Sequence, residues 1–465
     1  MGGFFGVTSW QDCSADLFYG TDFHSHLGTK RGGLAIVRKD GFCRVIHNIE
    51  NAQFRSKFAS DLDDLHSWAG IGVISDTDDQ PVLIRSHLGS YAIATVGVIQ
   101  NAEALAGELI VRRRVHFTEL SAGLNPTELA AMIIDQEGSF EAGLRRLQEA
   151  VDGSCSVLIL TEKGIYAARD RYGRTPLVVG RKEGSWAVAM ESCAFSNLDF
   201  TVERDLGPGE VVFMTPEGVE TREPPLSRLR ICAFLWVYYG YPASSYEGIN
   251  VEAVRYRCGA ALARRFPAAV DFAAGIPDSG VGHGLGYAAE AKIPFRRPFV
   301  KYTPTWARSF MPQNQDVRNL VARMKLIPIR DLIEGRKILF CEDSIVRGTQ
   351  LRDTIKRLYD AGALEVHMRP ACPPLVYSCR YLNFSVSRSE MDLAARRAIS
   401  DIEGGMPADL GDYARPETEK YRRMEERIRD RIGLTSLRYQ QMGDLVGAIG
   451  LPKDRLCTYC WDAEG

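Results

Sequence analysis

The residues with the clearest chemistry lie in one segment, Lys337 to Gln350, which reads KILFCEDSIVRGTQ. Glu342 and Asp343 place two carboxylates side by side, and such a pair can hold a divalent cation or two neighbouring sugar hydroxyls. Ser344 and the Gly348-Thr349 pair follow with hydroxyls and backbone N–H groups, which bind phosphate at the start of a helix. A sugar phosphate with neighbouring hydroxyls needs both features, so the segment predicts a site for such a ligand.

Two regular elements must position this segment. Ile338 to Cys341 is a short unbroken apolar run, typical of a strand buried on both faces of a parallel sheet. Leu351 to Tyr359 predicts a helix, so the polar residues fall in the turn between them, where parallel α/β sheets bind ligands. The alternative is a solvated acidic turn that follows a core strand.

A second turn of the same type precedes it in the chain. Val270 to Ala274 predicts a strand and the residues from His283 to Ala291 predict a helix, with Pro277-Asp278-Ser279-Gly280 between them. Alone, this strand–Gly–helix connection is a weak signal because such turns are common. It nevertheless predicts a second anion-binding turn.

Length and composition limit the architecture and the partners. A chain of 465 residues exceeds one ordinary core, so we expect two sizeable domains. The net charge of -2 argues against a general nucleic-acid surface, and no apolar run is long enough to span a membrane. No signal-peptide pattern is present and 11 cysteines are scattered along the chain, so we expect a cytoplasmic protein without a disulfide framework.

The first half, to about residue 214, reads mainly as strands bounded by Gly, Asp or Asn. The predicted strands are 4–7, 33–37, 70–74, 91–98, 154–160 and 186–190. Helices are predicted at Thr127 to Glu137, capped by Asn125 or Thr127, and at Ser139 to Val151. The segment Thr215 to Arg230 mixes charge and proline without periodicity and predicts a linker, after which strands and helices alternate as in a parallel α/β unit.

Seven short motifs follow one another along this first half. They are Gly2-Gly3-Phe4-Phe5-Gly6-Val7, Arg31-Gly32-Gly33, Asn125-Pro126-Thr127-Glu128, Ala167-Ala168-Arg169-Asp170, Gly173-Arg174-Thr175-Pro176-Leu177, Glu191-Ser192-Cys193-Ala194-Phe195 and Asp205-Leu206-Gly207-Pro208-Gly209-Glu210. In order and spacing they resemble the class II glutamine amidotransferase domain. The resemblance implies an N-terminal-nucleophile sandwich of two sheets between helices.

The residues that would carry the chemistry of that domain are altered. The resemblance implies a cysteine nucleophile whose own α-amino group is the base, and Gly2 stands in its place. Cys13 could serve only after removal of a propeptide, but it leads into a predicted helix rather than a strand. The segment after Ile71-Gly72 lacks the implied clamp arginine, and no Asn-Gly pair supplies the oxyanion segment near Asn101. We therefore expect the glutaminase half to be inert.

The second half carries its own resemblance. Lys337 to Gln350 resembles the phosphoribosylpyrophosphate (PRPP) loop of type I phosphoribosyltransferases, and the turn at Pro277 resembles the pyrophosphate loop of PRPP amidotransferases. The PRPP-binding residues that this implies are Asp278, Ser279, Gly280, Lys301, Glu342, Asp343, Ser344, Arg347, Gly348 and Thr349, and the implied Mg²⁺ ligands are Ser279, Glu342 and Asp343. Tyr302-Thr303-Pro304 stands where the family has Asn-Arg-Tyr, so the arginine of the closing loop is absent or replaced by Arg308.

Four of the cysteines suggest a metal centre. Cys457 and Cys460 form the one Cys-X-X-Cys pair, Cys232 opens the second half, and Cys379 lies downstream of the PRPP loop. Some PRPP amidotransferases hold a [4Fe-4S] cluster with cysteines in these contexts, so the resemblance implies such a cluster here. The alternative is a lone Cys-X-X-Cys that binds zinc or stays free. The other cysteines, Cys13 apart, are expected to be buried small apolar residues.

The combined resemblance spans the chain and implies a member of the glutamine PRPP amidotransferase family with a degenerate glutaminase half. The implied fold is an α+β N-terminal-nucleophile-type sandwich over residues 1–225, then an α/β type I phosphoribosyltransferase domain with a C-terminal cluster-binding segment over residues 226–465. We expect 5-phosphoribosylamine or a related N-riboside to form from PRPP and ammonia or another amine, with a separate glutaminase as one ammonia source. The alternative is a catalytically silent PRPP- or nucleotide-binding regulatory protein. Family analogy favours a homo-oligomer.

Overall fold

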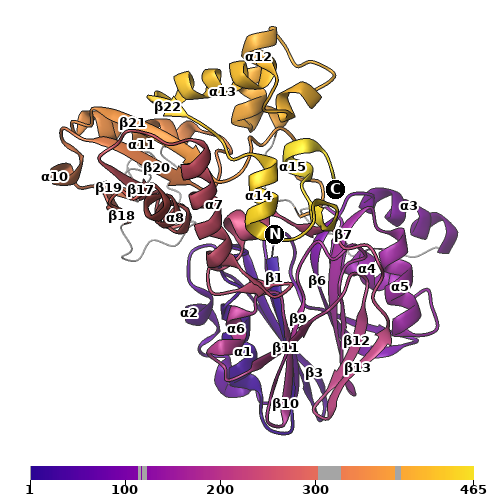
Figure 1. Cartoon of the computed structure of the whole chain (residues 1–465). Helices are drawn as coiled ribbons and strands as arrows, with labels where there is room; N and C mark the ends of the chain where they lie inside the picture. Colours follow the sequence, from indigo (N-terminus) through magenta and orange to yellow (C-terminus); the bar gives the residue numbers. More distant parts are fainter. Residues whose placement is uncertain (1, 114–116, 118–122, 302–325, 383–388) are drawn as a thin grey trace.

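The computed structural model describes the chain apart from residues 1, 114–116, 118–122, 302–325 and 383–388. The described residues form two bodies, a sandwich built from the first half and an α/β body built from the second (Figure 1). The described chain starts at Gly2 where the two bodies meet, and the C-terminal segment also packs at this junction (Figure 1). No described helix is long and apolar enough to cross a membrane.

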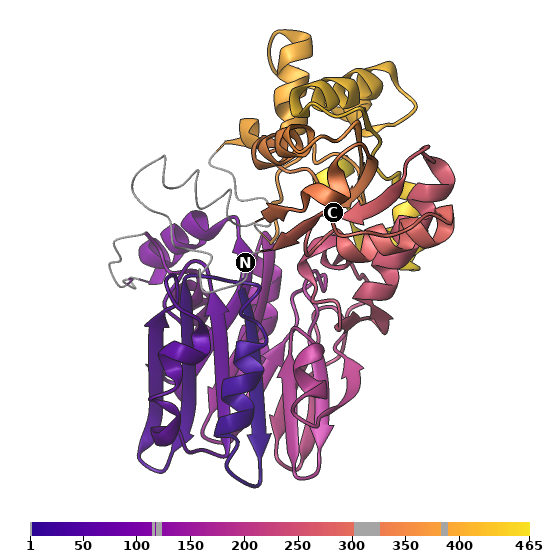
Figure 2. The same cartoon turned by 90° about the vertical axis from the view of Figure 1, so that its left-hand side faces the viewer.

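The first body contains two antiparallel sheets. The seven-stranded sheet has the order β11 (Thr201–Asp205), β9 (Val178–Lys182), β10 (Ser185–Ala189), β1 (Gly2–Ser9), β4 (Ala69–Ser75), β2 (Arg31–Arg38) and β3 (Gly41–Asn48). The six-stranded sheet has the order β13 (Gly218–Glu223), β12 (Val211–Thr215), β8 (Gly164–Ala168), β7 (Gly153–Thr161), β6 (Gly89–Ile99) and β5 (Val82–Ser86). Their strands run side by side in Figure 2.

Helices cover the outer face of each sheet, as predicted. The helices α1 (Ser14–Asp22), α2 (Phe54–Phe58) and α6 (Cys193–Ser196) lie beside the first sheet, and α3 (Ala102–Arg113), α4 (Pro126–Ile134) and α5 (Phe140–Ala150) lie beside the second (Figure 1). Strand β1 explains the layering, because alternate side chains of a strand point to opposite faces. Phe4 joins the core between the sheets, whereas Phe5 joins the core under α1, and both are fully buried.

The predicted elements of the sandwich are confirmed, with one correction. All six predicted strands are present, and Asn125 caps α4 by accepting a hydrogen bond from the Thr127 N–H at 2.9 Å. Ser139 caps α5 by accepting one from the Ala142 N–H at 3.3 Å. The predicted linker was wrong at its start, because residues 218–223 form β13 and pair with β12. This strand lies at the edge of its sheet and buries none of its six residues, so its sequence has no apolar alternation to reveal it.

The second body is built on a parallel sheet. Its order is β17 (Phe272–Gly275), β20 (Lys337–Glu342), β21 (Glu365–Pro370) and β22 (Ser436–Leu437), with neighbouring strands parallel throughout. Strand β20 has Leu339 in the core on one face and Phe340 in the core on the other, both fully buried. The prediction of a strand buried on both faces is thus confirmed, and it places β20 in the middle of the sheet.

Helices and short strands complete this body. They are β14 (Ile231–Cys232), β15 (Ser245–Tyr246), β16 (Ile249–Asn250), α7 (Val251–Arg265), α8 (Val281–Ala291), β18 (Phe299–Lys301), β19 (Leu326–Pro328), α10 (Arg330–Ile333), α11 (Thr349–Asp360), α12 (Ala394–Glu403), α13 (Glu419–Ile432), α14 (Met442–Ile449), β23 (Leu456–Cys457) and α15 (Tyr459–Asp462). Strands β14 and β23 pair in parallel and bring the C-terminal segment back to the start of this body.

Candidate functional site

The two predicted anion-binding turns lie against each other at the carboxyl ends of β17 and β20. Gly275 pairs with Cys341 across the two strands, and the Ile276 N–H donates to the Cys341 carbonyl at 3.0 Å. Gly280 must be a glycine in this arrangement, because a Cβ there would lie 2.3 Å from the Cys341 carbonyl oxygen. The backbone therefore brings together two turns that are more than sixty residues apart, at the strand ends where this class of sheet binds ligands.

The acid pair lies where the two turns touch. Ser279 Oγ donates to Glu342 Oε1 at 3.2 Å, and the Asp343 N–H donates to the same oxygen at 3.2 Å. Only 8% of Glu342 and 5% of Asp343 is exposed. Burial and the neighbouring Asp343 carboxylate raise the pKa of Glu342 well above its ordinary value. Two adjacent buried carboxylates repel each other, so a cation or hydroxyl donors at this site would stabilise the ionised pair.

The loop after the acid pair is shaped for phosphate. Ser344 Oγ donates to Asp343 Oδ1 at 2.5 Å, which fixes the first turn of the loop. Gly348 has a φ of 72° immediately before α11, a left-handed conformation that favours glycine. Thr349 then begins α11, whose free backbone N–H groups favour an anion. The predicted residues of this loop therefore lie together, at the same edge as the acid pair.

Sequence reasoning missed part of the positive charge beside this loop. A groove of about 220 Å³ is lined by Arg347, Gly348, Thr349, Arg352, Ala394, Arg397, Ile428, Arg431 and Ile432. Arg397, from α12, also donates to the Arg347 carbonyl and so holds the loop. Arg352 could have been identified because it lies in the first turn of the helix after the loop. Arg397 and Arg431 could not, because only the tertiary fold brings α12 and α13 to this place.

The remaining predicted ligand of this site lies at the edge of the described chain. Lys301 Nζ is 2.6 Å from Asp278 Oδ2, and both side chains are largely exposed. This ion pair brings a positive charge to the turn that was predicted to bind pyrophosphate. Arg308, predicted as a replacement for the arginine of the closing loop, lies outside the described residues.

The position of the missing nucleophile is filled by backbone. Gly2 pairs with Ser75 at the start of β1, next to β4. A Cβ on Gly2 would lie 2.2 Å from the Ile74 carbonyl oxygen, which is closer than any normal contact. Gly3 is also confined, because its Cβ would lie 2.8 Å from the buried ring of His24. A side chain at position 2 therefore requires the backbone of β1 or β4 to move.

Other residues that could have rescued the glutaminase chemistry have structural roles. Cys13 is buried immediately before α1, and burial raises the pKa of its thiol far above the ordinary value. Asn101 Nδ2 donates to the Ala150 carbonyl at 2.9 Å, and its Oδ1 accepts from the Asp152 N–H at 2.9 Å. The thiol is thus protonated and inaccessible, and both ends of the Asn101 amide are already bonded.

A buried carboxylate joins the two bodies near this position. Glu191 accepts hydrogen bonds from Ser244 Oγ and from the Tyr246 hydroxyl, the latter at 2.9 Å, and His26 Nε2 lies 3.1 Å away. Burial by itself would raise the pKa of Glu191, but the bonds from His26 and Ser244 outweigh it and lower the pKa. Burial lowers the pKa of His24, which is fully buried nearby, to about 4. We read this network as an interdomain anchor rather than a catalytic group.

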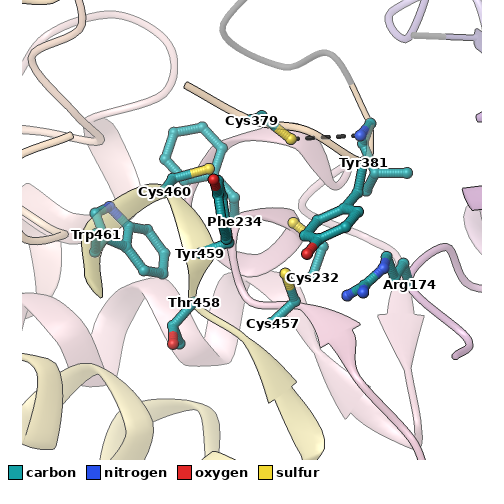
Figure 3. Close-up of a pocket in the computed structure, with 11 residues that line it drawn as sticks. Arg174, Cys232, Phe234, Cys379, Tyr381, Cys457, Thr458, Tyr459, Cys460 and Trp461 are labelled. Carbon is teal, nitrogen blue, oxygen red and sulfur yellow. Dashed lines mark hydrogen bonds between the residues drawn. The ribbon is translucent and has the colours of Figure 1, made fainter. Parts of the chain in front are cut away.

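The four predicted cluster cysteines line one small pocket (Figure 3). Cys232 and Cys457 are register partners in the pairing of β14 with β23, and the Leu382 N–H donates a hydrogen bond to the Cys379 sulfur at 3.3 Å. Phe234, Tyr459 and Trp461 provide apolar walls. The fold thus unites four cysteines that are up to 228 residues apart in the sequence (460 minus 232). Cys43, expected to be buried, is half-buried instead.

The donor sets can be tested for fit to the implied cofactors. Among the described residues, no three His, Cys, Asp or Glu side chains converge closely enough to hold a single metal ion. A [4Fe-4S] cluster needs only one thiolate for each iron, so its four cysteines surround a volume instead of meeting at one point. The four-cysteine pocket fits a cluster better than zinc. At the acid pair, Mg²⁺ commonly uses one or two carboxylates together with substrate phosphates and water, which fits Glu342 and Asp343.

Comparisons with known proteins cover both bodies. Residues 66–197 match the family described as a glutamine amidotransferase domain. The amidophosphoribosyltransferase of Bacillus subtilis is 30% identical over 422 residues, which cover 88% of this chain and 86% of that protein. The amidophosphoribosyltransferase of Methanocaldococcus jannaschii is 29% identical over 490 residues, which cover 99% of this chain and 96% of that protein. The solved structure of glutamine PRPP amidotransferase from B. subtilis, complexed with ADP and GMP, matches with a TM-score of 0.83 at 26% identity, over 99% of this chain and 96% of that one.

Proposed function

The chain belongs to the amidophosphoribosyltransferase family, and on that basis we propose that it forms 5-phosphoribosylamine, or a related N-riboside, from PRPP and ammonia or another amine instead of glutamine. Its fold is the predicted one, an N-terminal-nucleophile-type sandwich followed by a type I phosphoribosyltransferase domain. The observation that carries the proposal is the contrast between the two halves. Gly2 stands where the nucleophile is needed, whereas the two turns predicted to bind PRPP are in contact with each other.

The proposed reaction follows from the way the two turns at the ends of β17 and β20 lie together. The ammonia nitrogen attacks C1 of the ribose, the bond from C1 to the pyrophosphate oxygen breaks, and the nitrogen then loses a proton to solvent. Backbone N–H groups at Gly348 and Thr349 would hold the 5′-phosphate, and the carboxylates of Glu342 and Asp343 would hold the ribose hydroxyls. Fixing the sugar at both ends orients C1 toward the attacking nitrogen.

The leaving group would be bound by the second turn. The residues from Asp278 to Gly280 and the Lys301 ammonium lie where a pyrophosphate would leave, next to the acid pair. Mg²⁺, held by Ser279, Glu342 and Asp343, would neutralise the pyrophosphate charge when bound. The buried carboxylates also stabilise positive charge that develops at the ribose centre in the transition state.

We further propose that Cys232, Cys379, Cys457 and Cys460 hold a [4Fe-4S] cluster with a structural role. The pairing of β14 with β23 and the single pocket that all four cysteines line support this proposal. Anaerobically purified protein should then be brown and contain about four iron and four sulfide per chain. Cys457→Ser and Cys460→Ser should lose iron, whereas the control Cys43→Ser, outside the pocket, should keep it. Colourless anaerobic protein with stoichiometric zinc would refute the cluster.

The test of the proposed activity is pyrophosphate release. With Mg²⁺ and PRPP, ammonium should support release in proportion to the concentration of free ammonia, and glutamine should not. PRPP binding without release under any amine would favour the regulatory alternative. Glutamate formation at the rate of release would show a working glutaminase and refute the proposal. The cytoplasmic location, the homo-oligomer and a separate glutaminase as ammonia source stay predictions.

A further inference from the structure

Arg174 is a buried arginine that crosses from the sandwich to the cysteine pocket. It follows β8 in the loop that contains Gly173 and Thr175, and 4% of the residue is exposed. Its carbonyl accepts a hydrogen bond from the Cys232 N–H at 3.1 Å. Its side chain lines the pocket together with the four cysteines (Figure 3). The first body therefore contributes a charged residue to a site whose sulfur atoms all come from the second.

The guanidinium of Arg174 is held in place by aromatic rings. Its central carbon lies 3.5 Å from the centre of the Tyr381 ring and 5.1 Å from the centre of the Tyr172 ring. Tyr381 follows Cys379 by two residues, so this contact also fixes the loop that carries that cysteine. In Figure 3 the guanidinium lies below the Tyr381 ring, on the side of the pocket that Cys457 occupies. Stacking fixes the plane of the guanidinium but does not itself provide acceptors for its N–H groups.

Two nitrogen atoms of this guanidinium have no hydrogen-bond partner among the described residues. Nε and Nη1 of Arg174 are buried and donate no hydrogen bond to any described residue. A buried donor without an acceptor costs about 1–3 kcal/mol, and more when it is charged. No carboxylate is among the described residues that line this pocket. The sulfur atoms are therefore the negative groups that can compensate the buried guanidinium.

We propose that Arg174 is the countercharge and hydrogen-bond donor of the four-cysteine cluster, so that the sandwich positions and tunes the iron-sulfur centre. This inference rests on the proposed cluster. Four thiolates with the cluster core form an anion whose negative charge grows on reduction. A fixed positive charge and N–H donors near sulfur stabilise the reduced form more than the oxidised form and raise the reduction potential. They also hold the thiolates against release of iron.

The proposal gives the sandwich a role that does not need glutaminase chemistry. Arg174 lies in the motif Gly173-Arg174-Thr175, and Asp170 fixes this loop by accepting a hydrogen bond from the Thr175 N–H at 3.1 Å. The loop backbone, the aromatic stack and the pocket thus form one continuous path from the first body to the cluster. Loss of the nucleophile leaves this path intact.

The test replaces Arg174 in the full-length protein purified anaerobically. Arg174→Met removes the charge and donors, Arg174→Lys keeps the charge but loses the planar donor fork, and Arg171→Met is the matched control. Arg171 is an exposed residue of the same loop, stacks on Tyr172 at 5.8 Å and does not line the pocket. Two quantities are measured: the midpoint potential of the cluster by spectroelectrochemistry, and the rate of iron release to a ferrous chelator.

Arg174→Met should lower the midpoint potential and release iron about 10-fold faster, a typical loss for a residue that supports metal ligands. Arg174→Lys should shift the potential less than Arg174→Met does, and Arg171→Met should match the wild type in both measurements. If Arg174→Met fails to fold, Arg174→Lys still decides, because unchanged potential and iron release in it would overturn the proposal. If the wild type contains iron and Arg174→Met has the same midpoint potential and iron-release rate, only the inference about Arg174 is overturned. Wild type without iron after anaerobic reconstitution would overturn the cluster itself.

Discussion

Removing the charge of Asp343 should weaken ligand binding without lowering the stability of the free protein. In the free protein, Asp343 and Glu342 are adjacent buried carboxylates, and burial together with their proximity raises the pKa of Glu342 well above its ordinary value. Asp343→Asn removes one charge at constant shape. It should therefore weaken Mg-PRPP binding while leaving the unfolding free energy unchanged or slightly higher. Simple misfolding cannot give this combination.

The size of the effect follows from the charges. Attraction between a unit charge of the metal and one carboxylate at 4 Å is about 4 kcal/mol at an effective dielectric constant of about 20. Asp343→Asn loses this attraction in the complex, but in the free protein it also removes the repulsion between Asp343 and Glu342. The second effect offsets part of the first. A net loss of about 2–3 kcal/mol corresponds to roughly 30- to 150-fold weaker binding.

Isothermal titration calorimetry with Mg-PRPP and thermal unfolding of the free protein measure the two quantities. Asp360→Asn is the control, because Asp360 is an exposed acid at the far end of α11. Equal affinity of Asp343→Asn and wild type for Mg-PRPP would refute the placement of ligand at this acid pair. A large fall in melting temperature would refute the argument from carboxylate repulsion.

Three further predictions test other parts of the account. Glu342→Gln should be more stable than the wild type by an amount that grows as the pH rises above 4.5. The reason is that the pKa of Glu342 is raised in the folded protein, so ionisation of this carboxyl destabilises the wild type. A difference in unfolding free energy that does not change with pH in denaturant titrations would contradict this. Glu191→Gln should lower the unfolding free energy by about 1–3 kcal/mol at neutral pH. Because the pKa of Glu191 is lowered in the folded protein, this loss should shrink as the pH falls below 4.5. Equal stability of variant and wild type at pH 7 would show that the interdomain network contributes nothing. Gly2→Cys should release no glutamate from glutamine, since its Cβ would lie 2.2 Å from the Ile74 carbonyl oxygen; a glutaminase rate typical of an active amidotransferase would contradict the steric argument.

Sequence alone predicted the parts of the site that depend on local order along the chain. The apolar run of β20, the acid pair and the glycine before α11 are consecutive, so their spacing identifies both the strand and the turn. The absence of a cysteine at Gly2 is likewise visible in the sequence. These features need no knowledge of tertiary packing.

Other features depend on residues that meet only in the folded chain. The crowding at Gly2 comes from the Ile74 carbonyl of a neighbouring strand, and Arg397 reaches the PRPP loop from a separate helix. Arg174 was recognised as part of a motif, but its contact with the cysteine pocket requires both bodies. Strand β13 was missed because an exposed edge strand lacks the apolar alternation that marks a half-buried one.

The source of the product nitrogen tests the central claim most directly. Purified protein is incubated with PRPP, Mg²⁺, ¹⁵N-labelled ammonium and unlabelled glutamine together, and the phosphoribosylamine formed is analysed by mass spectrometry. Because Gly2 offers no nucleophile and the two turns predicted to bind PRPP are in contact with each other, the account predicts that the product nitrogen comes from the labelled ammonium. Unlabelled product that accumulates with an equal amount of glutamate would contradict it.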